Sequence, residues 1–284
     1  MHLTRRDALK LSASAIAAGT LGLSATSALG DNKKHIPIGL QLYSVRSEMA
    51  KDVPGTIAAV AKMGYQGVEF AGYYDWKAAD LRKLLDDNGV VCCGTHTGLD
   101  TLLGDQLQKT IEYNNILGNP FLIVPGLPDN LRDTPEACKK TGELLTELAE
   151  KVKPQGMFVG YHAHGFDFRL VDGKTTWTWI FENTTKDVIA QMDTGNCLAG
   201  GGDPVEEIKR FPGQGTSVHL KPFGNDGQPI GVGEGNKVPW ETIFELCRTV
   251  AGTEWYVVEY ENDPIPPIEA VEVCLKNLKK MGIN

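Results

Sequence analysis

Histidine and acidic side chains recur directly after short apolar runs in this 284-residue chain. Four of the six histidines lie at such positions: His96, His162, His164 and His219. Imidazole nitrogens and carboxylate oxygens from separate segments are donors that bind a divalent metal ion. The pattern predicts a metal site, provided that the fold brings the ends of these runs together.

Three consecutive runs in the second half of the chain each carry one such residue at or just after their C-terminal end, namely Asp193, His219 and Glu259. One residue from each run could reach a shared point without backbone strain. Each also has an ordinary structural alternative. Asp193 could cap a turn or a helix, and His219 could be a hydrogen-bonded core histidine. Glu259 could form a buried ion pair with Lys221, because a buried carboxylate needs a partner.

Eight apolar runs could position these residues. Each is nearly continuous, which predicts a strand buried on both faces, as in parallel sheets. The runs are Ile36–Tyr43, Gly67–Phe70, Val90–Cys93, Phe121–Val124, Met157–Tyr161, Val188–Met192, Ser217–Leu220 and Trp255–Val258.

Amphipathic segments separate the runs. Leucines recur at helical spacing in Asp80–Asp87 and Thr141–Val152, and a last helix is expected over Ile268–Met281. Eight strand–helix units in roughly 250 residues predict an α/β fold with a single (β/α)8 TIM barrel over residues 31–284. A doubly wound open sheet is the alternative. Active sites of such barrels lie at the C-terminal ends of the strands, which is where the histidines and carboxylates fall.

The first 30 residues resemble a twin-arginine signal peptide. Arg5 and Arg6 precede a weakly apolar stretch, and Ala28-Leu29-Gly30 offers a small-residue cleavage site. A retained anchor is the alternative, because Leu11–Leu29 is nearly long enough to span a bilayer. The Ser, Thr and Gly content of this stretch disfavours a membrane-spanning anchor. We expect an exported, periplasmic protein with no stable membrane insertion after signal cleavage.

Net charge and cysteine spacing argue against two other classes of protein, those that bind nucleic acids and those held by a disulfide framework. The net charge of −8 repels phosphate backbones, so no nucleic-acid binding is expected. The six cysteines form no CxxC pair, and no disulfide framework is predicted. The segment Gly231–Gly235 lacks the third glycine of a dinucleotide-binding motif. We interpret it as a loop that closes over the site.

Several motifs, in chain order, resemble those of the sugar phosphate isomerase/epimerase superfamily, which has a xylose isomerase-like barrel. They are GLQLYSVR, GYQGVEF, YHAHGFDF, MDTGN, VHLKP, GVGEGN and WYVVEYENDP. The resemblance implies a small carbohydrate substrate and one divalent metal ion, Mn²⁺ or else Co²⁺, Zn²⁺ or Mg²⁺. Ketose 3-epimerases of this superfamily bind the ion through Glu, Asp, His and Glu from strands five to eight. The corresponding residues here are His162, Asp193, His219 and Glu259.

The first of these positions departs from the epimerase pattern, because His162 stands where those enzymes have a glutamate of their acid/base pair. His164 is the alternative ligand, and a hydrogen-bonded His162–His164 pair without metal is a further one. The histidine-rich strand end and the WYVVEYENDP segment resemble inosose dehydratases, which eliminate water from a keto-polyol. Both reactions begin with proton removal next to a polarised carbonyl.

We therefore expect an isomerase or epimerase of carbohydrate metabolism. A dehydratase or lyase acting on a keto-polyol or keto-glycoside is the alternative, and a non-catalytic periplasmic carbohydrate-binding barrel is a third. The strand ends carry few cations, only Arg46 and Lys221, so we expect an unphosphorylated substrate. A homo-oligomeric state stays open.

The remaining polar residues at the strand ends receive roles in this chemistry. We expect Glu259 or His164 to act as the base and Lys221 to stabilise negative charge on a substrate oxygen. Glu69 has the alternative of a salt bridge inside the barrel. The expected substrate-binding residues are Gln41, Tyr43, Glu69, His96, Asp167 and Glu234.

Overall fold

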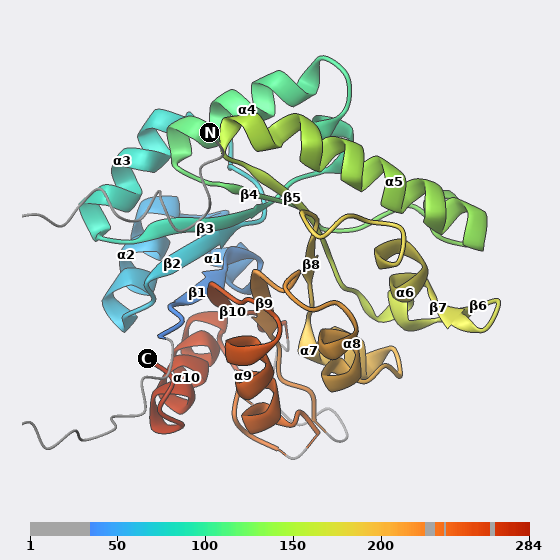
Figure 1. Cartoon of the computed structure of the whole chain (residues 1–284). Helices are drawn as coiled ribbons and strands as arrows, with labels where there is room; N and C mark the ends of the chain where they lie inside the picture. The colour runs from blue at the N-terminus through green and yellow to red at the C-terminus, as the bar shows by residue number, and fades with distance from the viewer. Residues whose placement is uncertain (1–34, 225–230, 236, 262–264) are drawn as a thin grey trace, which may run out of the picture. The chain divides into compact units, whose positions relative to one another are not determined.

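The computed structural model describes residues 35–224, 231–235, 237–261 and 265–284. The predicted leader, residues 1–30, lies outside the described residues, so export stays a prediction. In the described part of the chain, strands occupy the centre and helices surround them (Figure 1).

Eight parallel strands form one sheet in the order β8-β5-β4-β3-β2-β1-β10-β9. The (β/α)8 barrel is confirmed, and the open doubly wound sheet is wrong. Seven predicted runs match strands to within two residues at each end, whereas the third strand extends three residues further and ends at His96. The strands are β1 (Ile38–Gln41), β2 (Gly67–Phe70), β3 (Val91–His96), β4 (Phe121–Val124), β5 (Phe158–His162), β8 (Ile189–Gln191), β9 (Ser217–Leu220) and β10 (Trp255–Val258).

The two edge strands of this order, β8 and β9, meet where the barrel closes. The contact consists of a parallel bridge between Asp193 and His219. The backbone N–H of His219 donates to Met192 O at 2.8 Å, and that of Ala190 donates to Gln214 O at 2.8 Å. We call this contact the closure seam.

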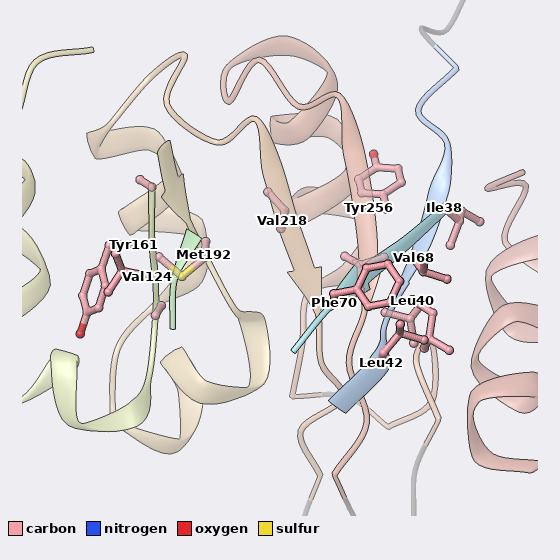
Figure 2. Packing of buried hydrophobic residues seen from close by; sticks show 14 of the residues in the cluster. Ile38, Leu40, Leu42, Val68, Phe70, Val124, Tyr161, Met192, Val218 and Tyr256 are labelled. Atoms are coloured by element: carbon pink, nitrogen blue, oxygen red, sulfur yellow. The ribbon is translucent and has the colours of Figure 1, made fainter. Parts of the chain in front are cut away.

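Alternation along the strands separates two layers of side chains. Ile38 and Leu40 of β1 and Val68 and Phe70 of β2 belong to the main hydrophobic cluster (Figure 2). This cluster also includes residues of the surrounding helices. The opposite face of the strands points into the barrel, where a second, smaller cluster consists of Phe121, Ile123 and Ile189, with Phe158 and Trp255 packed against it. Towards the C-terminal ends of the strands the interior side chains become polar, and these form the site.

Helices lie outside the sheet and begin and end with expected signals. Pro135 opens α5 behind the cap Thr134, and Gly64 and Gly89 end α2 and α3 with left-handed φ values of 104° and 66°. The helices are α1 (Arg46–Met49), α2 (Val53–Met63), α3 (Ala78–Asn88), α4 (Gln106–Leu117), α5 (Pro135–Val152), α6 (Thr176–Phe181), α7 (Thr194–Ala199), α8 (Pro204–Arg210), α9 (Trp240–Thr249) and α10 (Pro267–Lys280).

Short elements fill the connections. The 3₁₀ turns are η2 (Leu42–Val45), η3 (Leu99–Leu102), η4 (Asp129–Leu131), η5 (Lys153–Gln155) and η6 (Gly165–Phe168), and a hairpin joins β6 (Leu170–Val171) to β7 (Lys174–Thr175). All six cysteines are buried, and no disulfide links them in the described residues. None of the helices in the described part of the chain combines the length and apolarity needed to cross a membrane.

Candidate metal centre

Four side chains predicted as metal ligands converge at one end of the barrel. His162 ends β5, Asp193 follows β8, His219 lies in β9 and Glu259 follows β10. Each offers one ligand atom, and these atoms all lie within 4.8 Å of one another. All four residues are buried. Two imidazoles and two carboxylates at this spacing form a donor set suited to a divalent cation.

The two carboxylate oxygens of Asp193 differ, because one is hydrogen-bonded to the backbone and the other is not. Oδ1 accepts a 2.6 Å hydrogen bond from the backbone N–H of Asn196 and so caps α7. Oδ2 is buried and has no hydrogen-bond partner among the described residues; it lies 3.9 Å from His219 Nδ1. Burial raises the pKa of this carboxyl to about 7. The predicted cap is therefore present, and the second oxygen is left over for a cation.

His219 is held between two carboxylates. Its Nδ1 lies 2.6 Å from Glu259 Oε2, and its Nε2 lies 2.6 Å from Glu69 Oε2. Burial lowers the pKa of His219, but the two carboxylates outweigh burial and raise that pKa to about 10. The ring is thus an imidazolium that donates from both nitrogens. A cation bound at Nδ1 would replace that proton and face Asp193 and Glu259.

The pKa of His162 is shifted in the opposite direction to that of His219. Burial lowers its pKa well below the usual value, and the positive charge on His219 lowers it further, so the ring is neutral. Its Nδ1 lies 3.0 Å from Gln191 Oε1, and its Nε2 lies 4.0 Å from Glu259 Oε2. With the proton on Nδ1, the lone pair of Nε2 remains available to a metal. The residues present fit a divalent ion.

A cavity of about 370 Å³ opens beside this cluster. His164 lines this cavity. Its Nδ1 is buried and has no hydrogen-bond partner among the described residues. Its ring stacks on that of Phe166, with the ring centroids 5.1 Å apart and an interplanar angle of 6°. Burial lowers the pKa of His164, so the ring is a neutral base. The lining residues are Tyr43, Ala71, His96, Pro125, Gly126, His162, His164, Glu259 and Glu261.

Lys221 lies behind the cavity wall. Its Nζ donates to Asn196 Oδ1 at 3.0 Å and to Glu259 Oε1 at 3.2 Å, and it also contacts Glu261. Burial lowers its pKa, but neighbouring carboxylates outweigh burial and raise it above the usual value. The lysine is therefore a permanent cation. The ion pair between Lys221 and Glu259, predicted as an alternative, is present. Glu259 also belongs to the four-residue cluster.

Of the six expected substrate-binding residues, Tyr43 and His96 line the cavity. Gln41 and Glu69 lie fully buried beneath it. Gln41 Nε2 donates to Glu69 Oε2 at 2.8 Å, and the other Glu69 oxygen accepts from Gln191. Both residues face the barrel interior, but they are fully buried and are not among the described residues that line the cavity. Glu69 contacts the cluster from beneath through His219. This contact is the salt bridge inside the barrel that was expected as the alternative for Glu69.

Asp167 and Glu234 are also placed away from the cavity. Asp167 is buried and uses both carboxylate oxygens, accepting from Tyr161 OH at 2.7 Å and from the backbone N–H of His164 at 2.8 Å. Glu234 accepts from Asn277 Nδ2 at 2.8 Å, so residues 231–235 pack on α10. The expectation that residues 231–235 close over the site is wrong, because Glu234 contacts Asn277 and the Val232 backbone N–H donates to Cys274 Sγ, both on α10.

Gln191 is a site residue that the sequence interpretation missed, as is Glu261 in the cavity lining. Gln191 lies in β8 two positions before Asp193, and alternate residues of a strand share a face. Its side chain contacts His96, His162, Glu69 and Ser217. The two-residue spacing from Asp193 was the available signal.

Comparison with known proteins agrees with this architecture. The family model described as "Xylose isomerase-like TIM barrel" matches residues 57–281. The chain belongs to this family. Known members and structural neighbours are mostly enzymes, including sugar isomerases or epimerases and a dehydratase.

Individual relatives of the barrel are distant in sequence. A rhizopine catabolism protein of Rhizobium meliloti is 24% identical, with 83% of this chain and 84% of the relative covered. The inosose dehydratase of Geobacillus kaustophilus is 23% identical, with 75% and 84% covered. A sugar phosphate isomerase/epimerase structure from Parabacteroides distasonis superposes with a TM-score of 0.76 at 22% identity, covering 88% of this chain and 98% of the other.

Metal affinity in this barrel is expected to rise with pH. The ion must displace the Nδ1 proton of His219, whose pKa is about 10, and it needs Asp193 ionised, whose pKa is about 7. Because protons compete for these atoms, the dissociation constant for Mn²⁺ should fall about tenfold per pH unit above pH 7, and more steeply below it. Calorimetric titrations at pH 6, 7 and 8 measure this slope and the released protons. A dissociation constant unchanged over this range would contradict the ligand assignment.

Proposed function

We propose that the protein is a divalent-metal-dependent enzyme that removes a proton next to a carbonyl of a sugar or keto-sugar, as an isomerase or epimerase does. The observation that carries the proposal is the buried cluster of His162, Asp193, His219 and Glu259, with its unpartnered Asp193 oxygen, beside an open cavity. When bound there, a divalent cation would polarise a substrate carbonyl. Mn²⁺ suits the mixed imidazole and carboxylate donors, as do Co²⁺ and Zn²⁺.

The chain's own residues divide the remaining tasks. Burial keeps the pKa of the His164 imidazole low, and the residue lines the cavity, which suits it to accept the proton. Glu259 is already held by His219 and Lys221 and serves better as a ligand. Lys221 holds a positive charge beside the cavity residues Glu259 and Glu261, and we assign it the stabilisation of negative charge that develops on the substrate.

Elimination from a keto-polyol or keto-glycoside is the second candidate. His162 supports it, because this residue occupies the strand-five position where the resembling epimerases have one of their two acid/base glutamates. A single base, followed by loss of water or an alcohol, needs no second carboxylate across the sugar carbon. The similarity to an inosose dehydratase favours the same alternative.

A deuterium experiment tests the shared first step. Metal-loaded protein is incubated in D₂O with keto-sugars, inososes and oxidised glycosides, and the products are analysed by NMR. For isomerisation, we expect deuterium at the carbon next to the carbonyl of the rearranged product. For elimination, the unsaturated product has lost the proton of that carbon, and we expect the deuterium in recovered substrate. Sugar binding without exchange or turnover would instead indicate a carbohydrate-binding barrel that lacks catalysis.

The substrate is expected to be unphosphorylated. No arginine or lysine is among the described residues that line the cavity, while two carboxylates, Glu259 and Glu261, do line it. Lys221 is engaged by three partners, and the Arg46 guanidinium lies over the Tyr43 ring, 4.5 Å from its centroid. A phosphate dianion would meet repulsion without a bidentate partner. A kcat/KM more than about tenfold higher for a sugar phosphate than for the matched sugar, or roughly 1.4 kcal/mol, would overturn this expectation.

Export through the twin-arginine route is proposed from the leader alone. Arg5 and Arg6 precede the weakly apolar stretch. Replacing both by lysine should leave the protein in the cytoplasm at its precursor length, whereas the unaltered chain should appear, shortened by about 30 residues, in the periplasmic fraction. Equal distribution of the two forms would exclude this route.

A further inference from the structure

The amide of Gln191 uses its full hydrogen-bonding capacity beneath the candidate metal centre. Its side chain is fully buried. Nε2 donates to Glu69 Oε1 and to Ser217 Oγ, each at 2.8 Å. Oε1 lies 3.0 Å from His162 Nδ1 and 3.1 Å from His96 Nε2. An amide offers two N–H donors and two carbonyl lone pairs, so all four are used.

Glu69 determines which way this amide faces. Glu69 Oε2 accepts from Gln41 Nε2, and the Gln41 amide is itself oriented by the Tyr43 backbone N–H, which donates to Gln41 Oε1. Glu69 Oε2 also lies 2.6 Å from His219 Nε2, so the Glu69 carboxylate acts as a hydrogen-bond acceptor here. The amide nitrogen of Gln191 must therefore point to Glu69. Its carbonyl oxygen then points to the two histidines, and both ring nitrogens that face it must carry a proton.

We propose that Gln191 is a positioning residue that sets the tautomers of His162 and His96 in opposite senses. His162 is protonated on Nδ1 and keeps its Nε2 lone pair, the atom that belongs to the metal cluster. His96 is protonated on Nε2, which leaves Nδ1 as the ring nitrogen that can keep a lone pair. Because His96 lines the cavity, that lone pair can accept a hydrogen bond from a substrate hydroxyl.

This arrangement gives one buried side chain two functions. It prepares one histidine as a ligand and its neighbour as a hydrogen-bond acceptor, and it also braces Glu69, which in turn holds His219. The part concerning His162 rests on the proposed metal site. The tautomers themselves can be measured in metal-free protein.

The first test compares histidine tautomers by long-range ¹H–¹⁵N NMR in metal-free, ¹⁵N-histidine-labelled protein. We expect the unaltered protein to show Nδ1–H at His162 and Nε2–H at His96. Gln191→Met and the shorter Gln191→Asn should both give mixed tautomers. Gln191→Glu keeps an acceptor at this position and should keep both tautomers. Ser217→Ala removes the contact at the other end of the amide and serves as the matched control.

A lower melting temperature in Gln191→Met or Gln191→Asn, with His162 still protonated only on Nδ1, would show a purely structural role and overturn the proposal. Two substitutions are included because Gln191→Met leaves buried partners unsatisfied and Gln191→Asn keeps an amide in the same layer. Mixed tautomers in Ser217→Ala would also overturn it, because the effect would not be specific to the carbonyl end.

The second test titrates Mn²⁺ into the same variants. Loss of the partner that orients a ligand should weaken Mn²⁺ binding about 10- to 100-fold in Gln191→Met, with Ser217→Ala within about threefold of the unaltered protein. Equal affinity in Gln191→Met would overturn the metal part of the inference. Failure of the unaltered protein to bind Mn²⁺, Co²⁺ or Zn²⁺ would overturn the proposed function, while the tautomer result would be decided by the first test alone.

Discussion

Asp193→Ala is expected to abolish stoichiometric metal binding and, with it, activity. The substitution removes the buried Oδ2 that has no hydrogen-bond partner among the described residues, together with one of two negative charges in the four-residue cluster. We expect the affinity for Mn²⁺ to fall at least about 100-fold. Metal at 100 times its dissociation constant stabilises the unaltered protein by about 2.7 kcal/mol. The variant should therefore show no metal-dependent rise in melting temperature.

Asp203→Ala is the matched control for this experiment. Asp203 caps α8 by accepting from the backbone N–H of Val205 and Glu206, just as Asp193 caps α7 through Asn196. Each substitution should cost about 1 kcal/mol of stability through the lost cap. Only Asp193→Ala should lose metal, as measured by elemental analysis and thermal unfolding with and without chelator. Unchanged metal content in Asp193→Ala would exclude Asp193 as a ligand.

His164→Gln is expected to lower kcat by about 10²- to 10⁴-fold and to leave metal content unchanged. His164 lines the cavity and lies outside the four-residue cluster, so its loss removes a base without removing a ligand. Its lowered pKa keeps the imidazole neutral near pH 7, the form that accepts a proton. Turnover of the substrate found by the deuterium screen, measured with bound metal quantified, gives the result.

Phe166→Leu provides the comparison for His164→Gln. Its ring stacks on His164 and has the Arg132 guanidinium on it at 3.8 Å. Removing this support while keeping the imidazole should lower kcat by less than about tenfold. Added imidazole should partly restore His164→Gln but not Phe166→Leu. A kcat within tenfold of the unaltered enzyme in His164→Gln would move the base role to Glu259.

The fold and the cluster could both be predicted from the sequence because strands impose a strict two-residue period. Once the ends of β5, β8, β9 and β10 are known, the inward position nearest each C-terminal end follows, and these positions are His162, Asp193, His219 and Glu259. The same rule does not tell which inward-facing residues reach the cavity. Gln41 and Glu69 also face inward, but both are fully buried and hydrogen-bonded to each other, and neither lines the cavity.

Residues outside the strands were less predictable, because no period fixes where a loop side chain points. Asp167 follows the histidine-rich end of β5, yet its carboxylate turns back to Tyr161 and to the His164 backbone. Glu234 belongs to a glycine-containing loop whose partner, Asn277, is 43 residues further along the chain. Neither contact has a local sequence signal, since each depends on packing between distant segments.

The closure seam links the integrity of the barrel to occupancy of the metal centre. Asp193 and His219 form the bridge between β8 and β9, and both also belong to the cluster. Any opening that separates these strands divides the ligand set. By thermodynamic reciprocity, a bound ion must suppress that opening by the factor by which opening weakens the ion's binding. Exchange of the His219 backbone N–H, which donates across the seam to Met192, would report this local breathing motion directly.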